Sequence, residues 1–417
     1  MRQPASPSLW NHGDFLRLWA GQTVSQFGTQ ITVLALPLLA AVMLEASPFE
    51  MGLLGAAEMA PFLLIGLPAG VWVDRLPRRP LLIGGDVGRA LVLASIPIAH
   101  LVGLLTIWQL YVVAFVVGTL TVFFDVAYMA YLPALVNREQ LIEGNSKMET
   151  SRAAAEVAGP GIAGVLIQAL TAPVAIAFDA ASFLCSALVL GLIRRREPPA
   201  TLAPGGVRPA LLAEMREGLR FVLTHPLLRP IAFATGTINL FRSAIGALYV
   251  LFAVRDLGLD AATLGFVLAA GNAGFLFGAV LAGRAASSLG LGATIVGAAM
   301  LTGLGGLLLP FATPAFAVPV LIASGLLVGL GNPLYNVNQV SLRQAITPDR
   351  LQGRMNATMR FVVWGTMPIG YLTGGVAGEW LGLRTAIALL AVGAALAFLW
   401  LLFSPVRSLR EHPAPAQ

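Results

Sequence analysis

Membrane-length apolar segments follow one another along almost the whole chain, separated by short polar loops. Of the 417 residues, 57% are hydrophobic and only 11% are charged, whereas a soluble domain carries about 25% charged residues. A helix needs about 20 apolar residues to cross a bilayer. The chain therefore predicts an all-α membrane protein with twelve spans, over residues 15–44, 48–73, 80–105, 108–131, 148–170, 173–193, 227–253, 261–283, 289–309, 315–340, 355–379 and 383–404.

Positive charge is concentrated in the loops of one predicted membrane face. Of the 26 Lys+Arg, only Arg255 and Arg384 fall in loops of the opposite face, and Arg89 and Arg242 fall within spans. Cytoplasmic loops of membrane proteins carry an excess of Lys and Arg. We therefore expect both termini in the cytoplasm. The net charge of +6 then reflects membrane topology and not nucleic-acid binding.

One long polar linker divides the chain into two halves of six spans. We expect an N-terminal bundle over residues 1–193, a cytoplasmic linker over 194–226 and a C-terminal bundle over 227–417. Between Leu211 and Leu223, apolar residues recur at helical spacing beside charged ones. This pattern predicts an amphipathic helix that lies along the inner membrane surface.

The two halves are related by an internal repeat. A similar stretch follows the fourth span at residues 135–141 and the tenth span at residues 345–351, an offset of 210 residues. At the same offset, Gly164 corresponds to Gly374. Parallel six-span repeats predict two pseudo-symmetric six-helix bundles with a transport pathway between them.

A dense cluster of charge separates the second and third spans, in the stretch Gly70-Val71-Trp72-Val73-Asp74-Arg75-Leu76-Pro77-Arg78-Arg79. Charge is costly in hydrocarbon, so this stretch must lie at a membrane face. Gly66 and Gly70 precede the charges at a spacing of four, which predicts close approach of another helix. The second-half counterpart keeps its glycines and one Arg but lacks the Asp. This asymmetry favours a conformational latch over a substrate site.

Several motifs carry a family resemblance. The pattern Gly70-x-x-x-Asp74-Arg75-x-x-Arg78-Arg79 resembles the signature between the second and third spans of the major facilitator superfamily. Gly159-Pro160-x-x-Ala163-Gly164 resembles the fifth-span motif of its proton antiporters. Residues 132–145 and the element Asp179-x-x-Ser182-Phe183 are similar to the macrolide-efflux and enterobactin-exporter branch.

The resemblance implies a drug:proton antiporter of the bacterial-type cell membrane that exports hydrophobic or amphipathic small molecules by alternating access. In family geometry, Asp74 meets the eleventh helix near Asn356, and Asp125 meets Arg78 or Arg79. The resemblance also implies that the first, fourth, seventh and tenth spans line the central cavity. The predicted latch comprises Gly70, Asp74, Arg75, Arg78, Arg79, Asp125, Gly159, Pro160 and Gly164.

Acidic side chains inside spans are candidates for proton coupling. Glu58 lies about ten residues into the second span, and an intramembrane ionisable group is a functional candidate by default. We assign proton coupling to Glu58 and, second, to Glu156. The alternative for Glu58 is a carboxyl that holds helices together. Asp86 and Arg89 are spaced for a structural i,i+3 ion pair, and we expect a structural role for Asp179.

Polar side chains within the spans predict the wall of a water-filled cavity. Those of the first span share a helical face, for which helix–helix contact is the alternative explanation. Arg242 is a counter-charge or a group that binds anionic substrates, the alternative being a fixed ion pair with Glu58 or Asp125. The predicted cavity residues are Gln22, Ser25, Gln26, Thr29, Tyr128, Asn239, Arg242, Asn332, Tyr335 and Asn336.

Signatures of other protein classes do not occur in the sequence. Lys147 is the only lysine and no phosphate-binding glycine loop precedes it, which argues against ATP as an energy source. Cys185 is the only cysteine and the four histidines are scattered, so we expect no metal site, no cofactor and no enzyme activity. The expected partners are a small-molecule substrate, protons and the lipid bilayer, with the protein as a monomer. The rival functions are a dedicated siderophore or metabolite exporter and a non-transporting scaffold or channel.

Overall fold

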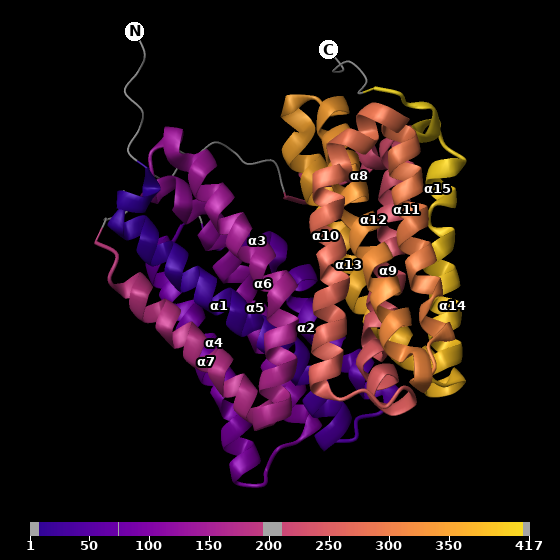
Figure 1. Ribbon diagram of the computed structural model, residues 1–417. Coiled ribbons are helices and arrows are strands. Elements are labelled where there is room, and N and C mark those ends of the chain that lie inside the picture. The colour runs from indigo at the N-terminus through magenta and orange to yellow at the C-terminus, as the bar shows by residue number, and fades with distance from the viewer. Residues whose placement is uncertain (1–7, 74, 195–210, 412–417) are drawn as a thin grey trace. The chain divides into compact units, whose positions relative to one another are not determined.

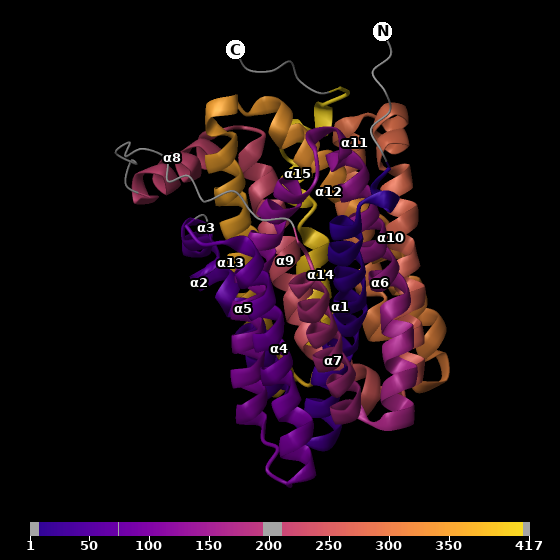
Figure 2. The same ribbon diagram turned by 90° about the vertical axis from the view of Figure 1, so that its left-hand side faces the viewer.

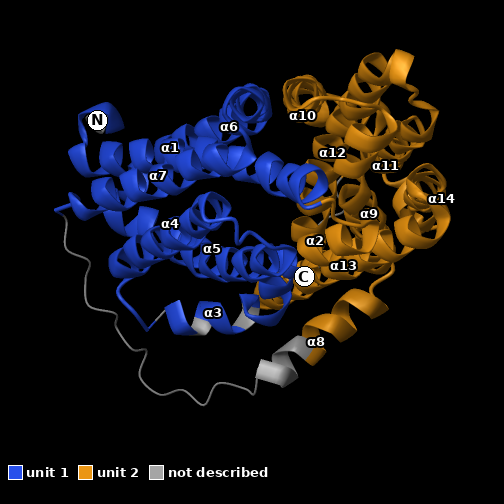
Figure 3. Ribbon diagram, turned by 90° about the horizontal axis from the view of Figure 1, so that it is seen from below, with its two compact units in different colours: residues 1–44, 57–204 blue, residues 45–56, 205–417 orange. Residues whose placement is uncertain are grey.

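A computed structural model of the protein describes residues 8–73, 75–194 and 211–411, and this part of the chain consists of helices joined by turns, without a β-strand (Figure 1). The helices form two compact units (Figure 3). Unit 1 contains residues 1–44 and 57–204, and unit 2 contains residues 45–56 and 205–417. The boundary between residues 45–56 of unit 2 and residues 57–204 of unit 1 lies inside helix α2, Pro48–Leu64.

Unit 1 is built on α1, which packs along α6 and α7, and on α4, which packs along α5 and α7 (Figure 2). The π-helical turn Leu39–Met43 extends α1, and single 3-10 turns cover Leu9–Asn11 and Arg138–Gln140. Small residues at the α1–α7 contact bring the two helices close together, because a Cβ at Gly28 would collide with Ser182. The helices of this unit are α1 Gly13–Leu38, α3 Gly66–Val73, α4 Arg78–Leu101, α5 Ile107–Leu135, α6 Leu141–Leu170 and α7 Ala172–Gly191.

Unit 2 is built on α12, which packs along α10 and α11, and on α13, which packs along α9. Short turns complete it at Phe252–Asp256, Leu309–Phe311, Pro314–Phe316 and Pro405–Ser408. The first half of α2 also packs in this unit, where Gly52 faces Gly375 of α13. The helices are α8 Leu211–Thr224, α9 Leu228–Leu251, α10 Ala261–Leu289, α11 Leu291–Leu307, α12 Ala317–Ile346, α13 Asp349–Leu381, α14 Leu383–Leu396 and α15 Leu399–Leu402.

Ten helical segments of the described chain are long and apolar enough to cross a membrane. This confirms the all-α membrane fold, and every one of the twelve predicted spans is helical. The second span differs from the prediction because it is broken at Ile65 into α2 and α3. Pro61 precedes the break and Gly66 follows it, and both residue types weaken a helix. The eleventh span corresponds to α13, which is long enough but less apolar.

The predicted amphipathic helix of the linker is present as α8, but protein covers part of it. Its Val222 is fully buried in the core of unit 2, and α8 packs against α13 and α9. Glu217 forms ion pairs with Arg350, at 3.2 Å, and with Arg354 of α13. These contacts attach one face of α8 to α9 and α13, and its expected position along the inner membrane surface stays a prediction.

The internal repeat extends to the turns that end α6 and α13. Gly382 follows α13 with φ of 77° and ψ of 157°, and Thr171 follows α6 with φ of 82° and ψ of 156°. This backbone region is essentially restricted to glycine and costs other residues about 1–3 kcal/mol. The first half therefore keeps the turn of the second half with a residue that strains it.

We expect Thr171→Gly to relieve this strain and to raise the free energy of unfolding by about 1–3 kcal/mol. Thermal unfolding of the detergent-purified protein measures the change. The reciprocal variant Gly382→Thr should lower stability at the matching turn by a similar amount. An unchanged or lowered unfolding temperature for Thr171→Gly would show that the turn is not strained.

Candidate functional site

A pocket of about 410 Å³ opens between α1, α5 and α6 within unit 1. Two predicted cavity residues, Gln26 and Tyr128, line it. The remaining lining residues, which the sequence analysis did not select, lie on α6 at Asn145, Ser146, Met148, Glu149 and Arg152. Most of these recur at spacings of three and four, which places them on one helical face. This spacing is visible in the sequence and could have identified the lining residues of α6.

The charges on the α6 side of the pocket neutralise one another in part. Arg152 forms ion pairs with Glu149, at 2.5 Å, and with Glu156, at 3.0 Å. Its side chain and that of Glu149 remain about half exposed, at 49% and 63%. Glu156, the second candidate for proton coupling, is thus held by an arginine one turn away. The pocket combines both signs of charge with an aromatic ring and a thioether.

The other polar residues of α1 are placed differently from the prediction. Gln22 and Ser25 are buried, and Ser25 donates a hydrogen bond to the Gln22 carbonyl oxygen at 3.2 Å. Thr29 donates to the Ser25 carbonyl oxygen at 2.9 Å. Because α1 packs along α7, Gln22 and Ser25 belong to a helix–helix contact and do not line an open cavity wall. Helix–helix contact, the alternative to a cavity wall, therefore explains Gln22 and Ser25.

Glu58 lies in α2 between Ala57 and Pro61, in the part of the helix that belongs to unit 1. Its backbone carbonyl faces Gly118 of α5, where a Cβ would collide with it. No ion pair joins the Glu58 carboxyl to another described residue of unit 1.

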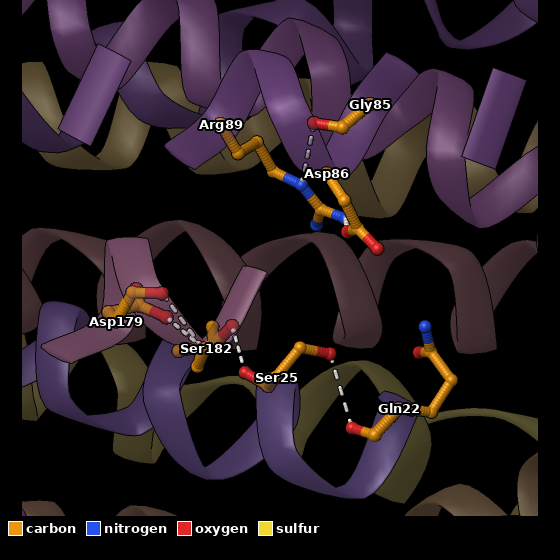
Figure 4. A network of polar contacts seen from close by, with 8 residues as sticks. Gln22, Ser25, Gly85, Asp86, Arg89, Asp179 and Ser182 are labelled. Atoms are coloured by element: carbon orange, nitrogen blue, oxygen red, sulfur yellow. Dashed lines mark hydrogen bonds and ion pairs between the residues drawn. The ribbon is translucent and has the colours of Figure 1, made fainter. Parts of the chain in front are cut away.

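A second group of ionisable side chains surrounds Arg89 of α4 (Figure 4). Arg89 forms the predicted ion pair with Asp86, at 2.5 Å between Nη2 and Oδ1. The guanidinium lies over the rings of Phe124 and Phe183, each with its centroid 4.2 Å away. Both charged side chains are buried, with Asp86 at 0% and Arg89 at 5% exposure.

Two further carboxyl groups lie on the helices that contribute these two rings, Asp125 on α5 and Asp179 on α7. Asp179 of α7 accepts hydrogen bonds from the Thr32 hydroxyl and, at 3.1 Å, from the Ser182 hydroxyl. Asp125 of α5 follows Phe124, whose ring lies against the Arg89 guanidinium. Asp125 forms no ion pair with Arg78 or Arg79 among the described residues, so the expected contact is not seen.

The arginines of the charged stretch bind backbone carbonyls instead. Arg78 donates to the Ala130 carbonyl oxygen at 3.1 Å, and Arg79 donates to that of Leu190 at 3.1 Å and to that of Gly191. Ala130 lies in the C-terminal part of α5, and Leu190 and Gly191 are the last residues of α7, where the negative end of the helix dipole attracts cations. The arginines thereby tie α4 to both helices.

The remaining latch residues have mixed placements. Asp74 lies outside the described residues, and Arg75 is exposed. A Cβ at Gly70 would meet no atom within 4 Å, so the expected close helix approach at this glycine is wrong. Gly159 does meet another helix closely, at the Gln30 side chain of α1. Pro160 and Gly164 are buried in the same stretch of α6.

In unit 2, Tyr335 lies in the core and not on a cavity wall. It is 4% exposed, and its hydroxyl lies 2.7 Å from that of Thr235 on α9. Asn336 of α12 is exposed, and its amide donates to the Asn332 side chain at 2.6 Å. On α9, Asn239 donates to the Thr235 carbonyl oxygen at 2.9 Å, and Arg242 is exposed.

The fold is that of the major facilitator transporters, a class of membrane transport proteins. The structure of a bacterial homologue of the iron transporter ferroportin in its inward-facing state superimposes with a TM-score of 0.73 at 18% identity, covering 95% of this chain and 99% of that one. A family model described as transmembrane secretion effector matches residues 6–416, and the chain belongs to this family.

Several relatives are named as exporters. The multidrug efflux pump Tap of Mycolicibacterium fortuitum is 29% identical over 88% of this chain and 89% of its own length. Macrolide efflux protein A of Streptococcus pyogenes is 22% identical over 89% and 90%. The enterobactin exporter EntS of Escherichia coli is 29% identical over 55% and 53%. The predicted resemblance is thus confirmed, and the chain is a multi-pass bacterial membrane transporter with a small-molecule substrate.

The placement of Tyr335 predicts that it contributes to stability and not to transport. Tyr335→Phe removes a buried hydrogen bond to Thr235 and should cost about 1 kcal/mol of the free energy of unfolding. Asn336→Ala, at the exposed neighbouring position, should change stability by less than about 0.5 kcal/mol. Thermal unfolding in detergent compares the two. If Tyr335→Phe kept a normal unfolding temperature but impaired efflux, Tyr335 would belong to the substrate cavity as first predicted.

Proposed function

We propose that the protein exports hydrophobic or amphipathic small molecules from the cell by proton antiport with alternating access. The observation that carries this proposal is the mixed lining of the unit 1 pocket. Tyr128 and Met148 offer an aromatic ring and a polarisable thioether, and Glu149 offers a half-exposed carboxylate. A flat, cationic and otherwise apolar compound finds a surface for stacking and a counter-charge there.

The sizes and names of the relatives support the same function. Tap and macrolide efflux protein A are aligned over nearly their full lengths and are named as efflux proteins. We further propose that both termini lie in the cytoplasm, in keeping with the concentration of Lys and Arg on one predicted face. The division into bundles over residues 1–193 and 227–417 with the linker 194–226, the monomeric state and independence from ATP belong to the same proposal.

Proton entry supplies the energy for export in this proposal. One proton that moves inward through about 100 mV contributes about 2.3 kcal/mol. Since about 1.4 kcal/mol corresponds to a tenfold ratio, one proton supports roughly a 50-fold gradient of a neutral compound. We propose Glu58 as a residue that carries this proton, because it is an embedded carboxyl without a charged neighbour. Glu156 is the second candidate, and its ion pair with Arg152 makes it a weaker one.

A host strain without its own efflux pumps tests the function. Cells that express the protein should retain less ethidium and tolerate more erythromycin than cells with an empty vector, and an uncoupler should abolish both effects. Glu58→Gln should lose efflux against a gradient while keeping transport down a gradient, because the amide cannot release a proton. Glu45→Gln, at a carboxyl in a turn outside the helices, provides the control.

Two results would contradict these proposals separately. Efflux that persists unchanged with the uncoupler would exclude proton antiport. Full uncoupler-sensitive efflux by Glu58→Gln would leave proton antiport in place and exclude Glu58 as the coupling residue.

We also propose that the stretch from Gly70 to Arg79 acts as a latch between conformations. Asp74→Asn should slow transport several-fold while leaving the affinity for substrate within about twofold, because a latch changes the populations of states and not the contacts of the substrate. Equilibrium binding of ethidium to purified protein, measured beside efflux, separates the two effects. Lost binding with normal transport of other compounds would instead place Asp74 in a substrate site.

A dedicated siderophore or metabolite exporter is the second candidate function. The observation that favours it is the exposed guanidinium of Arg242 on α9, a suitable group for an anionic substrate. Export of enterobactin, blocked by Arg242→Gln and unaffected by ethidium, would support this candidate over drug efflux.

A further inference from the structure

The carboxyl groups around Arg89 outnumber the positive charge available to them. Asp86 forms an ion pair with Arg89, whose guanidinium lies over the rings of Phe124 and Phe183, the neighbours of Asp125 and Asp179 on α5 and α7. No lysine or arginine of the described chain forms an ion pair with Asp125 or Asp179. If every group were ionised, the cluster would carry two uncompensated negative charges within a membrane-spanning bundle. Such a state is strongly disfavoured in a region of low dielectric constant. We propose that these three residues and Arg89 form a proton-binding site.

The contacts of each carboxyl group indicate its role in this site. Asp86 takes the direct ion pair with Arg89 through Oδ1, so it is the carboxylate that the guanidinium neutralises. Asp179 is 1% exposed and has only the hydroxyls of Thr32 and Ser182 as hydrogen-bond donors. A hydroxyl can also accept a hydrogen bond, so these partners suit both the ionised and the protonated acid. Asp125 and Asp179 are therefore the carboxyls that hold the extra protons.

The groups that face the cluster come from four helices. α4 contributes Asp86 and Arg89, α5 contributes Asp125 and Tyr128, and α7 contributes Asp179. α1 contributes the Thr32 hydroxyl. Glu58 of α2 forms no ion pair with a group of this cluster. The cluster is thus a second proton site, distinct from the one proposed at Glu58.

A stack of rings connects this site with the substrate pocket. Tyr128 lines the pocket and stacks on Phe124, with centroids 6.2 Å apart and an interplanar angle of 11°. The opposite neighbour of Phe124 is the Arg89 guanidinium, 4.2 Å from its ring centroid. A ligand that displaces Tyr128 would therefore move the surface on which Arg89 rests. A role of the cluster in transport rests on the proposed proton-coupled export, whereas the binding of protons by the cluster does not.

In each cycle, one O–H bond of a carboxylic acid forms with a proton from one membrane face and breaks toward the other face. No electrons are exchanged, and the only species transferred is the proton. Protonation of both Asp125 and Asp179 leaves the ion pair of Asp86 and Arg89 as the charged remainder, and this pair is neutral as a whole.

Infrared spectroscopy of the full chain in liposomes detects protonated carboxyl groups without any substrate. Wild-type protein at neutral pH should show a carboxylic acid C=O band that shrinks as the pH is raised. The double variant Asp125→Asn/Asp179→Asn should lose the part of that band that the cluster contributes and keep the part from Glu58, and each single variant should lose a smaller part. Asp14→Asn is the matched control, because Asp14 also forms an i,i+3 pair with an arginine, Arg17, at 2.6 Å but near the start of α1.

The same liposomes give the transport readout. Ethidium accumulation driven by a proton gradient should fall to background in Asp179→Asn, whereas ethidium movement down its own gradient should continue and Asp179→Glu should restore accumulation. A purely structural cluster would impair both kinds of movement together.

The outcomes separate the two proposals. A wild-type protein without a titrating acid band, or a double variant with an unchanged band, overturns the proton site whether or not ethidium is transported. A band that behaves as expected in a protein that moves no ethidium under a proton gradient supports the site and counts against the proposed export. The wild-type titration needs no variant, so a variant that fails to fold does not decide the result.

Discussion

The exclusion of unpaired charge from hydrocarbon governs this structure more than any other constraint. It explains why the arginine in the middle of α4 is held by an acid on its own helix and by aromatic rings from two others. It also explains why the arginines that begin α4 bind helix-end carbonyls. Where the constraint is met only in part, as in the acids around Arg89, the structure has room for a mobile proton.

The fold follows from the sequence to an unusual degree because the signals have long range. An apolar run of about 20 residues has few alternatives to a membrane helix, and the repeat constrains both halves at once. The prediction of one continuous second span missed the break at Ile65, because the hydropathy of residues 48–73 remains high across it. Helix breaks at Pro and Gly depend on neighbouring helices as much as on composition, so a hydropathy pattern alone does not position them.

The candidate site was less predictable, because a helical face does not reveal what covers it. Gln22 and Gln26 lie one turn apart on α1, yet Gln22 is buried and Gln26 lines a pocket. The pairing of Asp86 with Arg89 was predictable since both lie on one helix. The roles of Asp125 and Asp179 depend on contacts between distant segments.

The packing of residues 45–56 has a consequence for how the two halves of the chain recognise each other. This segment is covalently part of the first half, yet it folds with unit 2, where Arg255 donates to the Ala46 carbonyl oxygen and Glu379 accepts from the Phe49 amide. Helix α8, at the other boundary, is fixed to α13. If the chain were divided before α8, the first polypeptide would still carry residues 45–56, which pack in unit 2, and the second would keep the helices that receive them. Co-expressed fragments of this transporter should therefore reassemble in the membrane without a peptide bond between them.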